Sequence, residues 1–226
     1  EYTREMCQYP VIMLTLKSAK QRTYQEAMAC LREALSEEYA RHEEQIKVKL
    51  KHPDDLEKYM CIRRRHGKKE DDLTSLAFLS KCLCQIYQKK CIILIDEYDV
   101  PLEHAYFNGF YDEMAGFIRS LFESALKTNP YLEFAVVTGC LRISRESIFT
   151  GLNNLRIYSI LNENYGEYFG FTEEEIQGIL EYYDRKGNFP VVKEWYDGYC
   201  FGNTEIYNPW SILNHMEDIV TNQEAL

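Results

Sequence analysis

The sequence lacks long apolar runs, repeats and low-complexity linkers. No stretch approaches the about 20 apolar residues that cross a bilayer, and the first residues lack the basic-then-apolar order of a signal peptide. With 46% hydrophobic and 14% aromatic residues among 226, the chain has the composition of a folded protein with a substantial core. We therefore expect a soluble protein with no membrane partner.

The sequence also lacks the cysteine spacing of a disulfide framework or a zinc site. Cys82 and Cys84 are too close together for a zinc knuckle, and no second pair matches them. The eight cysteines are scattered through apolar segments, at Cys7, Cys30, Cys61, Cys82, Cys84, Cys91, Cys140 and Cys200. We expect reduced thiols and a cytoplasmic location.

Basic residues are fewer than acidic ones, with 26 lysines and arginines against 36 aspartates and glutamates. The formal net charge is −10, which counts against a broad nucleic-acid surface because affinity for phosphates comes mainly from lysine and arginine. The one basic run, residues 63–69, is followed at once by Glu70, Asp71 and Asp72. A solvated loop between helices is the favoured interpretation of this run, and a local nucleic-acid contact is the alternative.

Three apolar runs predict buried strands, at 11–16, 91–96 and 134–139, with a short fourth strand at 157–161. Helical spacing predicts helices at about 23–50, after Pro53, and at about 73–87 and 111–127. Because strands alternate with helices, we expect the α/β class, with a parallel sheet built through right-handed crossovers.

The chain after Gly170 has a different sequence pattern, with short helical segments that are rich in aromatic residues. Thr172 and Glu175 have the spacing of a capping box, and Pro209 suits a first helical turn. We therefore expect two domains, a core at 1–165 and a small helical subdomain at 166–226. Its aromatic residues form either its own core, which we favour, or a stacking or protein-binding surface: Trp195, Tyr196, Tyr199 and Phe201, near Asp197.

Polar side chains follow two of the predicted strands where each strand ends. Asp96 and Glu97 follow the apolar run 91–95, and Thr138 ends the run 134–137. The carboxyl edge of an open parallel sheet is where such folds bind ligands. The first acid suits Mg²⁺ held through water, and the second suits activation of an attacking water. The alternative is two solvated acids at a strand end.

The neighbouring positions extend this pattern. Thr138 is placed to contact the attacking water or a γ-phosphate, and Arg142 and Arg145 follow closely enough to neutralise developing charge. Taken alone, Thr138-Gly139 is more often a turn.

From residue 8 to about 219 the chain resembles the bacterial AAA-ATPase-like family that often precedes a PD-(D/E)XK nuclease-like domain. The resemblance rests on YPVIMLTLK, IILIDEYDVPLEHAY, YDEMAGFIRSLFESALK, LEFAVVTGCLRISRESIFTGLNNL, YFGFTEEE, EWYDGYCFG and IYNPWSIL. It implies a P-loop NTPase core of the ASCE type that binds and hydrolyses ATP with Mg²⁺.

The same resemblance implies roles for single residues. Asp96 and Glu97 match the Walker B acids, and Thr138 matches the sensor position. Arg142 and Arg145 fall in the motif after the sensor, and residues from 171 on match a winged-helix-like lid. A homo-oligomer is a further expectation, because an arginine of this motif can act across a subunit interface.

One element of that family is missing from the sequence. No G-x-x-x-x-G-K-S/T loop is present, and the single Gly-Lys pair, Gly67-Lys68, follows no predicted strand. We therefore expect this chain to be part of a longer protein, inactive alone, with a gap or a foreign strand beside the strand that ends at Thr138. The nuclease-like part is missing too, so nucleic acid is an indirect partner at most. The alternative function is an inactive NTPase-fold module for protein interaction or oligomerisation.

Overall fold

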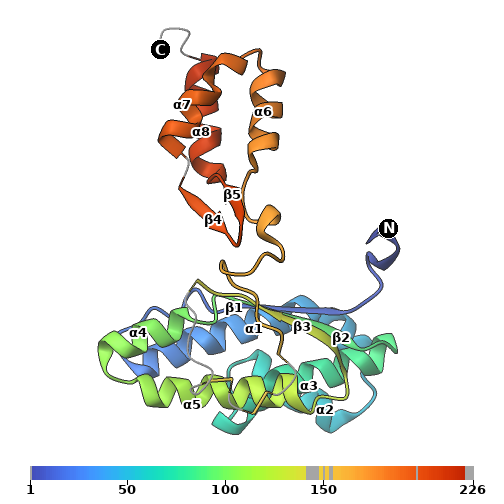
Figure 1. The fold of residues 1–226 in the computed structure, drawn as a ribbon. Coiled ribbons are helices and arrows are strands. Elements are labelled where there is room, and N and C mark those ends of the chain that lie inside the picture. Colours follow the sequence, from blue (N-terminus) through green and yellow to red (C-terminus); the bar gives the residue numbers. More distant parts are fainter. Residues whose placement is uncertain (1, 141–147, 150, 153–154, 197, 222–226) are drawn as a thin grey trace. The chain divides into compact units, whose positions relative to one another are not determined.

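The computed structural model describes residues 2–140, 148–149, 151–152, 155–196 and 198–221. The chain divides into two compact units, Glu1–Asn154 and Leu155–Leu226, each with its own hydrophobic core. Figure 1 shows the elements of each unit along the chain. Within the described residues, no helix combines the length and the apolar character that crossing a membrane requires.

The first unit contains a three-stranded parallel sheet. Its strands are β1 (Val11–Thr15), β2 (Cys91–Asp96) and β3 (Leu132–Val137), in the spatial order β1-β2-β3. The mixed α/β class and the three predicted parallel strands are therefore confirmed.

The fourth predicted strand is wrong, because residues 157–161 pair with no strand. Instead, the Ile160 carbonyl accepts a hydrogen bond from the Gly202 N–H at 2.7 Å, and the Ile160 side chain is exposed.

In the described part of the first unit, five α-helices lie between the strands along the chain, three between β1 and β2 and two between β2 and β3. They are α1 (Tyr24–Lys49), α2 (Pro53–Arg63), α3 (Lys69–Tyr87), α4 (Val100–Asn108) and α5 (Tyr111–Phe122), and a π-helical turn, Glu123–Lys127, extends α5. The Thr23 side chain accepts the Glu26 N–H at the start of α1, and Pro53 occupies the first turn of α2. The prediction missed α4 and started α3 four residues late. Short 3-10 turns lie at Tyr2–Glu5, Gly166–Tyr168 and Lys186–Asn188.

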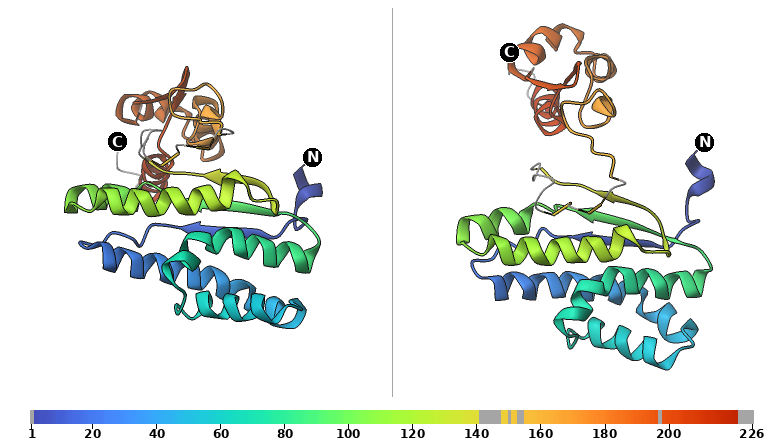
Figure 2. Two further views of the ribbon diagram at one scale, coloured as in Figure 1. Left: turned by 90° about the horizontal axis from the view of Figure 1, so that it is seen from below. Right: turned by 60° about the horizontal axis from the view of Figure 1, so that its bottom comes forward.

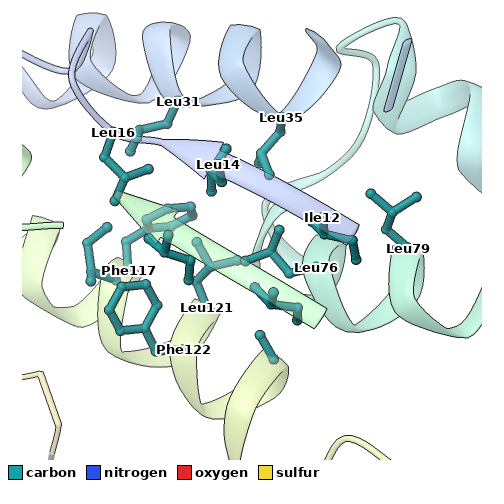
Figure 3. Packing of buried hydrophobic residues seen from close by; sticks show 14 of the residues in the cluster. Ile12, Leu14, Leu16, Leu31, Leu35, Leu76, Leu79, Phe117, Leu121 and Phe122 are labelled. Carbon is teal, nitrogen blue, oxygen red and sulfur yellow. The ribbon is translucent and has the colours of Figure 1, made fainter. Parts of the chain in front are cut away.

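Helices α1, α3 and α5 cover one face of the sheet (Figure 2). Every second residue of β1 points into this layer, so that Ile12 and Leu14, together with Leu16 directly after the strand, pack against leucines of α1 and α3 (Figure 3). Phe117, Leu121 and Phe122 of α5 belong to the same cluster. The alternating burial follows from the two-residue period of a strand.

The opposite face of the sheet is apolar and exposed in the first unit. Met13 of β1 and Phe134 and Val136 of β3 are large exposed hydrophobic residues, and Ile92 and Leu94 of β2 are partly exposed. Parallel sheets are normally covered on both faces, so this face has the composition of a surface that another layer covers.

The two edges of the sheet differ. At the β1 edge, the buried Glu38 of α1 accepts the Met13 N–H at 3.0 Å, and Arg41 donates to the Val11 carbonyl at 2.6 Å. Side chains thus occupy backbone groups to which another strand would bind. On its outer side β3 pairs with no strand in the described part of the chain.

The second unit is a three-helix core with a hairpin. Helices α6 (Glu173–Tyr182), α7 (Phe189–Tyr196) and α8 (Pro209–Thr221) accompany an antiparallel hairpin of β4 (Tyr199–Phe201) and β5 (Thr204–Ile206). The Thr172/Glu175 capping box and the position of Pro209 are confirmed. The core of this unit is Ile176, Leu180, Val192, Tyr207, Ile212, Met216 and Ile219.

The expectation that the aromatic residues near 195–201 form this core is wrong for two of them. Trp195 is 74% exposed and Tyr199 is 58% exposed, because the buried face of α7 is centred on Val192 and only Phe201 of β4 is partly buried. Tyr196 packs against the core as expected, Phe201 is partly buried, and Asp197 lies outside the described residues.

All eight cysteines are free thiols. Burial raises the pKa of Cys82 and of Cys91 to about 12. Both therefore stay protonated at neutral pH and serve as small apolar core residues.

Candidate functional site

The predicted site residues of β2 and β3 meet at one edge of the sheet. Asp96 is the last residue of β2, and Thr138 directly follows β3. The Thr138 Oγ1 donates a hydrogen bond of 2.5 Å to the Asp96 Oδ1. The expectation that these two side chains emerge at the same edge is confirmed.

Glu97 is held close to Asp96 by a turn in the backbone. Its φ of +55° lies in the left-handed region, which costs a side-chain-bearing residue about 1 kcal/mol or more. Its N–H donates to the Asp96 Oδ1 at 2.9 Å, and its carboxylate accepts a 3.4 Å hydrogen bond from Thr15. The turn therefore sends the two adjacent carboxylates to different neighbours.

The strand ends are fixed by hydrogen bonds that continue the ladder beyond the strands. Leu16 N–H donates to the Asp96 carbonyl at 3.0 Å, and Thr138 N–H donates to the Ile95 carbonyl at 2.8 Å. Tyr98 N–H donates to the Thr138 carbonyl at 3.1 Å. The polar side chains are thus carried by a backbone that is paired on both sides of β2.

Gly139 allows the segment after β3 to approach β2 closely. A Cβ atom at this position would lie 2.5 Å from the Asp99 Oδ1 and 2.7 Å from the Tyr98 ring. Both distances are shorter than real Cβ contacts, so a larger residue would force either these side chains or the segment after β3 to move. In the Thr138-Gly139 pair, the glycine therefore lets the backbone after β3 pass close to Tyr98 and Asp99, which helps to hold Thr138 in place.

Thr15 is a site residue that the sequence did not identify. It ends β1, it is paired in register with Asp96, and it contacts Glu97. The available signal was its place at the end of the first apolar run, equivalent to the places of Asp96 and Thr138 in theirs.

Three basic residues lie within seven positions after Thr15: Lys17, Lys20 and Arg22. All three are exposed, and in the described residues none lies within ion-pair distance of a carboxylate. This segment places positive charge after the strand that borders the acidic one.

Among the described residues, the side-chain groups that contact one another at this edge offer oxygen atoms as metal ligands. These groups are the carboxylates of Asp96 and Glu97 and the hydroxyls of Thr15 and Thr138. Such a set fits Mg²⁺, which prefers oxygen ligands and keeps much of its water shell. In the part of the chain that the structure describes, no group of three or more His, Cys, Asp or Glu side chains gathers to form a metal cage.

Arg142 and Arg145 lie outside the described residues. The other basic candidate, residues 63–69, forms the loop between α2 and α3, as favoured from the sequence. Arg63 pairs with Glu43 at 2.9 Å and Arg65 pairs with Glu33. Gly67-Lys68 precedes α3, and the Lys68 N–H donates to the Asp71 carboxylate, so this pair caps a helix.

Comparisons with known proteins find a distant relative and a family for this chain. A curated protein of Azotobacter chroococcum mcd 1, named "Uncharacterized protein in vnfD 5'region", is 28% identical over 130 residues. The aligned part is 55% of this chain and 24% of that protein, so the chain spans about a quarter of the length of this relative. No solved structure matches the chain. Residues 1–149 match the family described as predicted AAA-ATPase, and this chain belongs to that family.

Proposed function

We propose that the protein hydrolyses ATP and that this chain supplies the carboxylate half of the site. The observation that carries the proposal is the hydrogen-bonded convergence of Asp96, Glu97 and Thr138 at the carboxyl edge of a parallel sheet. Membership of the predicted AAA-ATPase family supports the same activity. The phosphate-binding loop comes from a segment outside residues 1–226.

Each side chain has a distinct role in the proposed reaction. Asp96 holds Mg²⁺ through water, and Mg²⁺, when bound, offsets the charge of the β- and γ-phosphates. Glu97 accepts a proton from the attacking water. Thr138 orients that water or the γ-phosphate, and Arg142 and Arg145 stabilise the charge that develops on the transferred group.

The second unit is proposed to act as a winged-helix-like lid. Its three helices and its short antiparallel hairpin are the parts of which a winged helix is made. Assembly into a homo-oligomer would let Arg142 or Arg145 serve a neighbouring site, and a nuclease-like domain elsewhere in the protein would supply any contact with nucleic acid.

A non-hydrolysing interaction module is the second candidate. The specific observation in its favour is that residues 1–226 contain no glycine-rich phosphate-binding loop. On this alternative, Asp96 and Glu97 serve only to shape a surface for protein contact or oligomerisation.

Replacing Glu97 by Gln in the full-length protein distinguishes the two candidates. The amide keeps the size of the side chain but removes the base, so ATP turnover should fall by a factor on the order of 100 or more while ATP binding is retained. Glu103→Gln is the matched control, since Glu103 is an exposed glutamate of α4 and should leave turnover unchanged. Normal turnover in Glu97→Gln would rule out the catalytic role.

Calorimetry of residues 1–226 with Mg-ATP provides the complementary measurement. Phosphate affinity in P-loop proteins comes mostly from the loop's backbone amides and lysine. The isolated chain should therefore bind ATP weakly, and tight saturable binding would show that it holds a phosphate site of its own.

A further inference from the structure

A row of three tyrosine rings lies on the surface of the second unit. Tyr158, Tyr165 and Tyr168, here called the tyrosine ridge, are 47%, 52% and 79% exposed. The centroid of the Tyr165 ring is 5.0 Å from that of Tyr158 and 6.4 Å from that of Tyr168. Exposed large aromatic side chains that contact one another are typical of interaction surfaces.

The segment that carries the tyrosine ridge is fastened to the β4–β5 hairpin, beside which it runs in Figure 1. The Gly202 N–H donates to the Ile160 carbonyl at 2.7 Å, and Asn203 donates to the Glu163 carboxylate. At the other end, Phe171 and Tyr207 form a bridge with backbone hydrogen bonds of 3.0 and 2.8 Å. The rings are therefore presented by a fixed backbone, which lowers the entropy lost when a partner binds.

The backbone at Tyr165 is strained. Its φ of +66° is unusual for a bulky residue. The next residue, Gly166, packs so tightly that a Cβ atom would lie 3.1 Å from the Phe201 carbonyl oxygen. Strain of this kind persists only where surrounding contacts determine it, and it is often associated with function.

Acidic residues outnumber basic ones near the tyrosine ridge, where the exposed Arg156 lies two residues before Tyr158. Residues 157–183 contain six glutamates and neither lysine nor arginine. Glu163 and Glu167 of this segment are exposed and lie within two residues of ridge tyrosines. A nucleic acid would be repelled by these carboxylates, and a purely apolar partner would leave them buried without compensation.

We infer that the tyrosine ridge binds an arginine-bearing segment of a protein partner. A guanidinium plane stacks on tyrosine faces and at the same time donates hydrogen bonds to carboxylates. Arginine is more weakly hydrated than lysine, so a lysine-bearing segment binds less well. This inference does not depend on the proposed ATP hydrolysis.

The test uses the whole chain and a fluorescent arginine-containing peptide, with its lysine counterpart and an oligothymidine as comparison probes. Fluorescence anisotropy should show the arginine peptide binding most tightly. Tyr165→Leu/Tyr168→Leu should weaken it about 5- to 30-fold, since each exposed cation–π contact contributes about 0.5–1 kcal/mol. Tyr182→Leu, which replaces an exposed tyrosine outside the ridge, should leave the affinity unchanged.

A second pair of variants separates local recognition from the overall negative charge. Glu163→Gln/Glu167→Gln should weaken peptide binding more than Glu174→Gln/Glu217→Gln, which removes the same charge from exposed positions on α6 and α8. Equal effects of the two pairs, or wild-type affinity in the tyrosine variant, would overturn the inference. Binding of oligothymidine that depends on the ridge tyrosines would also overturn it. So would a lower melting temperature of the tyrosine variant, because the rings would then serve internal packing.

Discussion

At the scale of single residues, the candidate site includes the hydroxyl of Thr15, which the sequence analysis did not predict. Thr15 is exposed and contributes little to the core, yet its Oγ1 is the group that contacts the Glu97 carboxylate. A hydrogen bond to a carboxylate oxygen restricts the orientation of that side chain. Thr15 is therefore a positioning residue for the proposed base.

Thr15→Val should lower ATP turnover of the full-length protein by about 2- to 10-fold. Valine has the shape of threonine but lacks the hydroxyl, and a single hydrogen bond contributes about 0.5–1.5 kcal/mol. Thr15→Ser restores the hydroxyl and should restore turnover, which a purely structural role of the methyl group would not permit. Steady-state ATPase assays on the three proteins provide the comparison. Equal rates for valine and serine would contradict the positioning role.

At the scale of elements, α1 performs two tasks. Its apolar stripe packs on β1, and its Glu38 and Arg41 close the outer edge of that strand. Burial acts to raise the pKa of Glu38, but hydrogen bonds from His42, Arg41 and the Met13 N–H outweigh it and lower the pKa below the ordinary value of 4.5. The charged carboxylate is thus the form that the fold stabilises.

This lowered pKa gives stability a defined pH dependence. A carboxyl whose pKa is lower in the folded state contributes stability above pH 4.5, and that contribution is lost as the pH falls below this value. The free energy of unfolding should therefore be higher in the wild type than in Glu38→Gln at pH 7, and the two should converge as the pH falls below 4.5. Urea unfolding followed by circular dichroism measures this difference. Glu44→Gln, at an exposed position of the same helix, should show no such convergence, and a constant difference for Glu38→Gln would exclude the linkage.

The elements that the sequence predicted well are those with an unbroken local signal. Strands β1 and β2 have continuous apolar runs that end at polar residues, and α6 has a capping box. Helix α4 was missed because it is short and follows the left-handed turn at Glu97, which no pattern announces. The 157–161 segment was misassigned because its apolar residues have the composition of a strand, while exposure and pairing depend on the distant hairpin.

The positions of three site residues were likewise predicted from local patterns, whereas a fourth was not. The pattern placed Asp96, Glu97 and Thr138 at strand ends, and parallel pairing then brought Asp96 and Thr138 within hydrogen-bond distance. Thr15 was missed because its contact depends on the register of β1 against β2, and nothing in the apolar run itself fixes that register.

At the scale of the whole molecule, the chain has two hydrophobic cores that share no residue. Both tryptophans, Trp195 and Trp210, belong to the second unit. Tryptophan fluorescence therefore reports on the second unit alone, whereas circular dichroism reports on the helices of both.

Leu79→Ala and Leu180→Ala should separate the unfolding of the two units. Each leucine is fully buried in a different core, and each substitution should cost about 2–5 kcal/mol. Leu180→Ala should move the fluorescence midpoint to lower denaturant, and Leu79→Ala should move only the circular dichroism transition. If Leu79→Ala shifts the fluorescence midpoint as far as Leu180→Ala does, the chain unfolds as one cooperative block and the prediction fails.

The unequal edges of the sheet limit how copies of this chain could assemble. Unlimited polymerisation through strands needs a donor edge and an acceptor edge on every copy, so that each added copy offers a new place for the next. Here Glu38 and Arg41 occupy backbone groups of β1, and the outer side of β3 is the open edge of this three-stranded sheet among the described residues. Two copies joined β3 to β3 would consume the open edge of each three-stranded sheet, so pairing through this sheet ends at a pair and cannot propagate into a fibre.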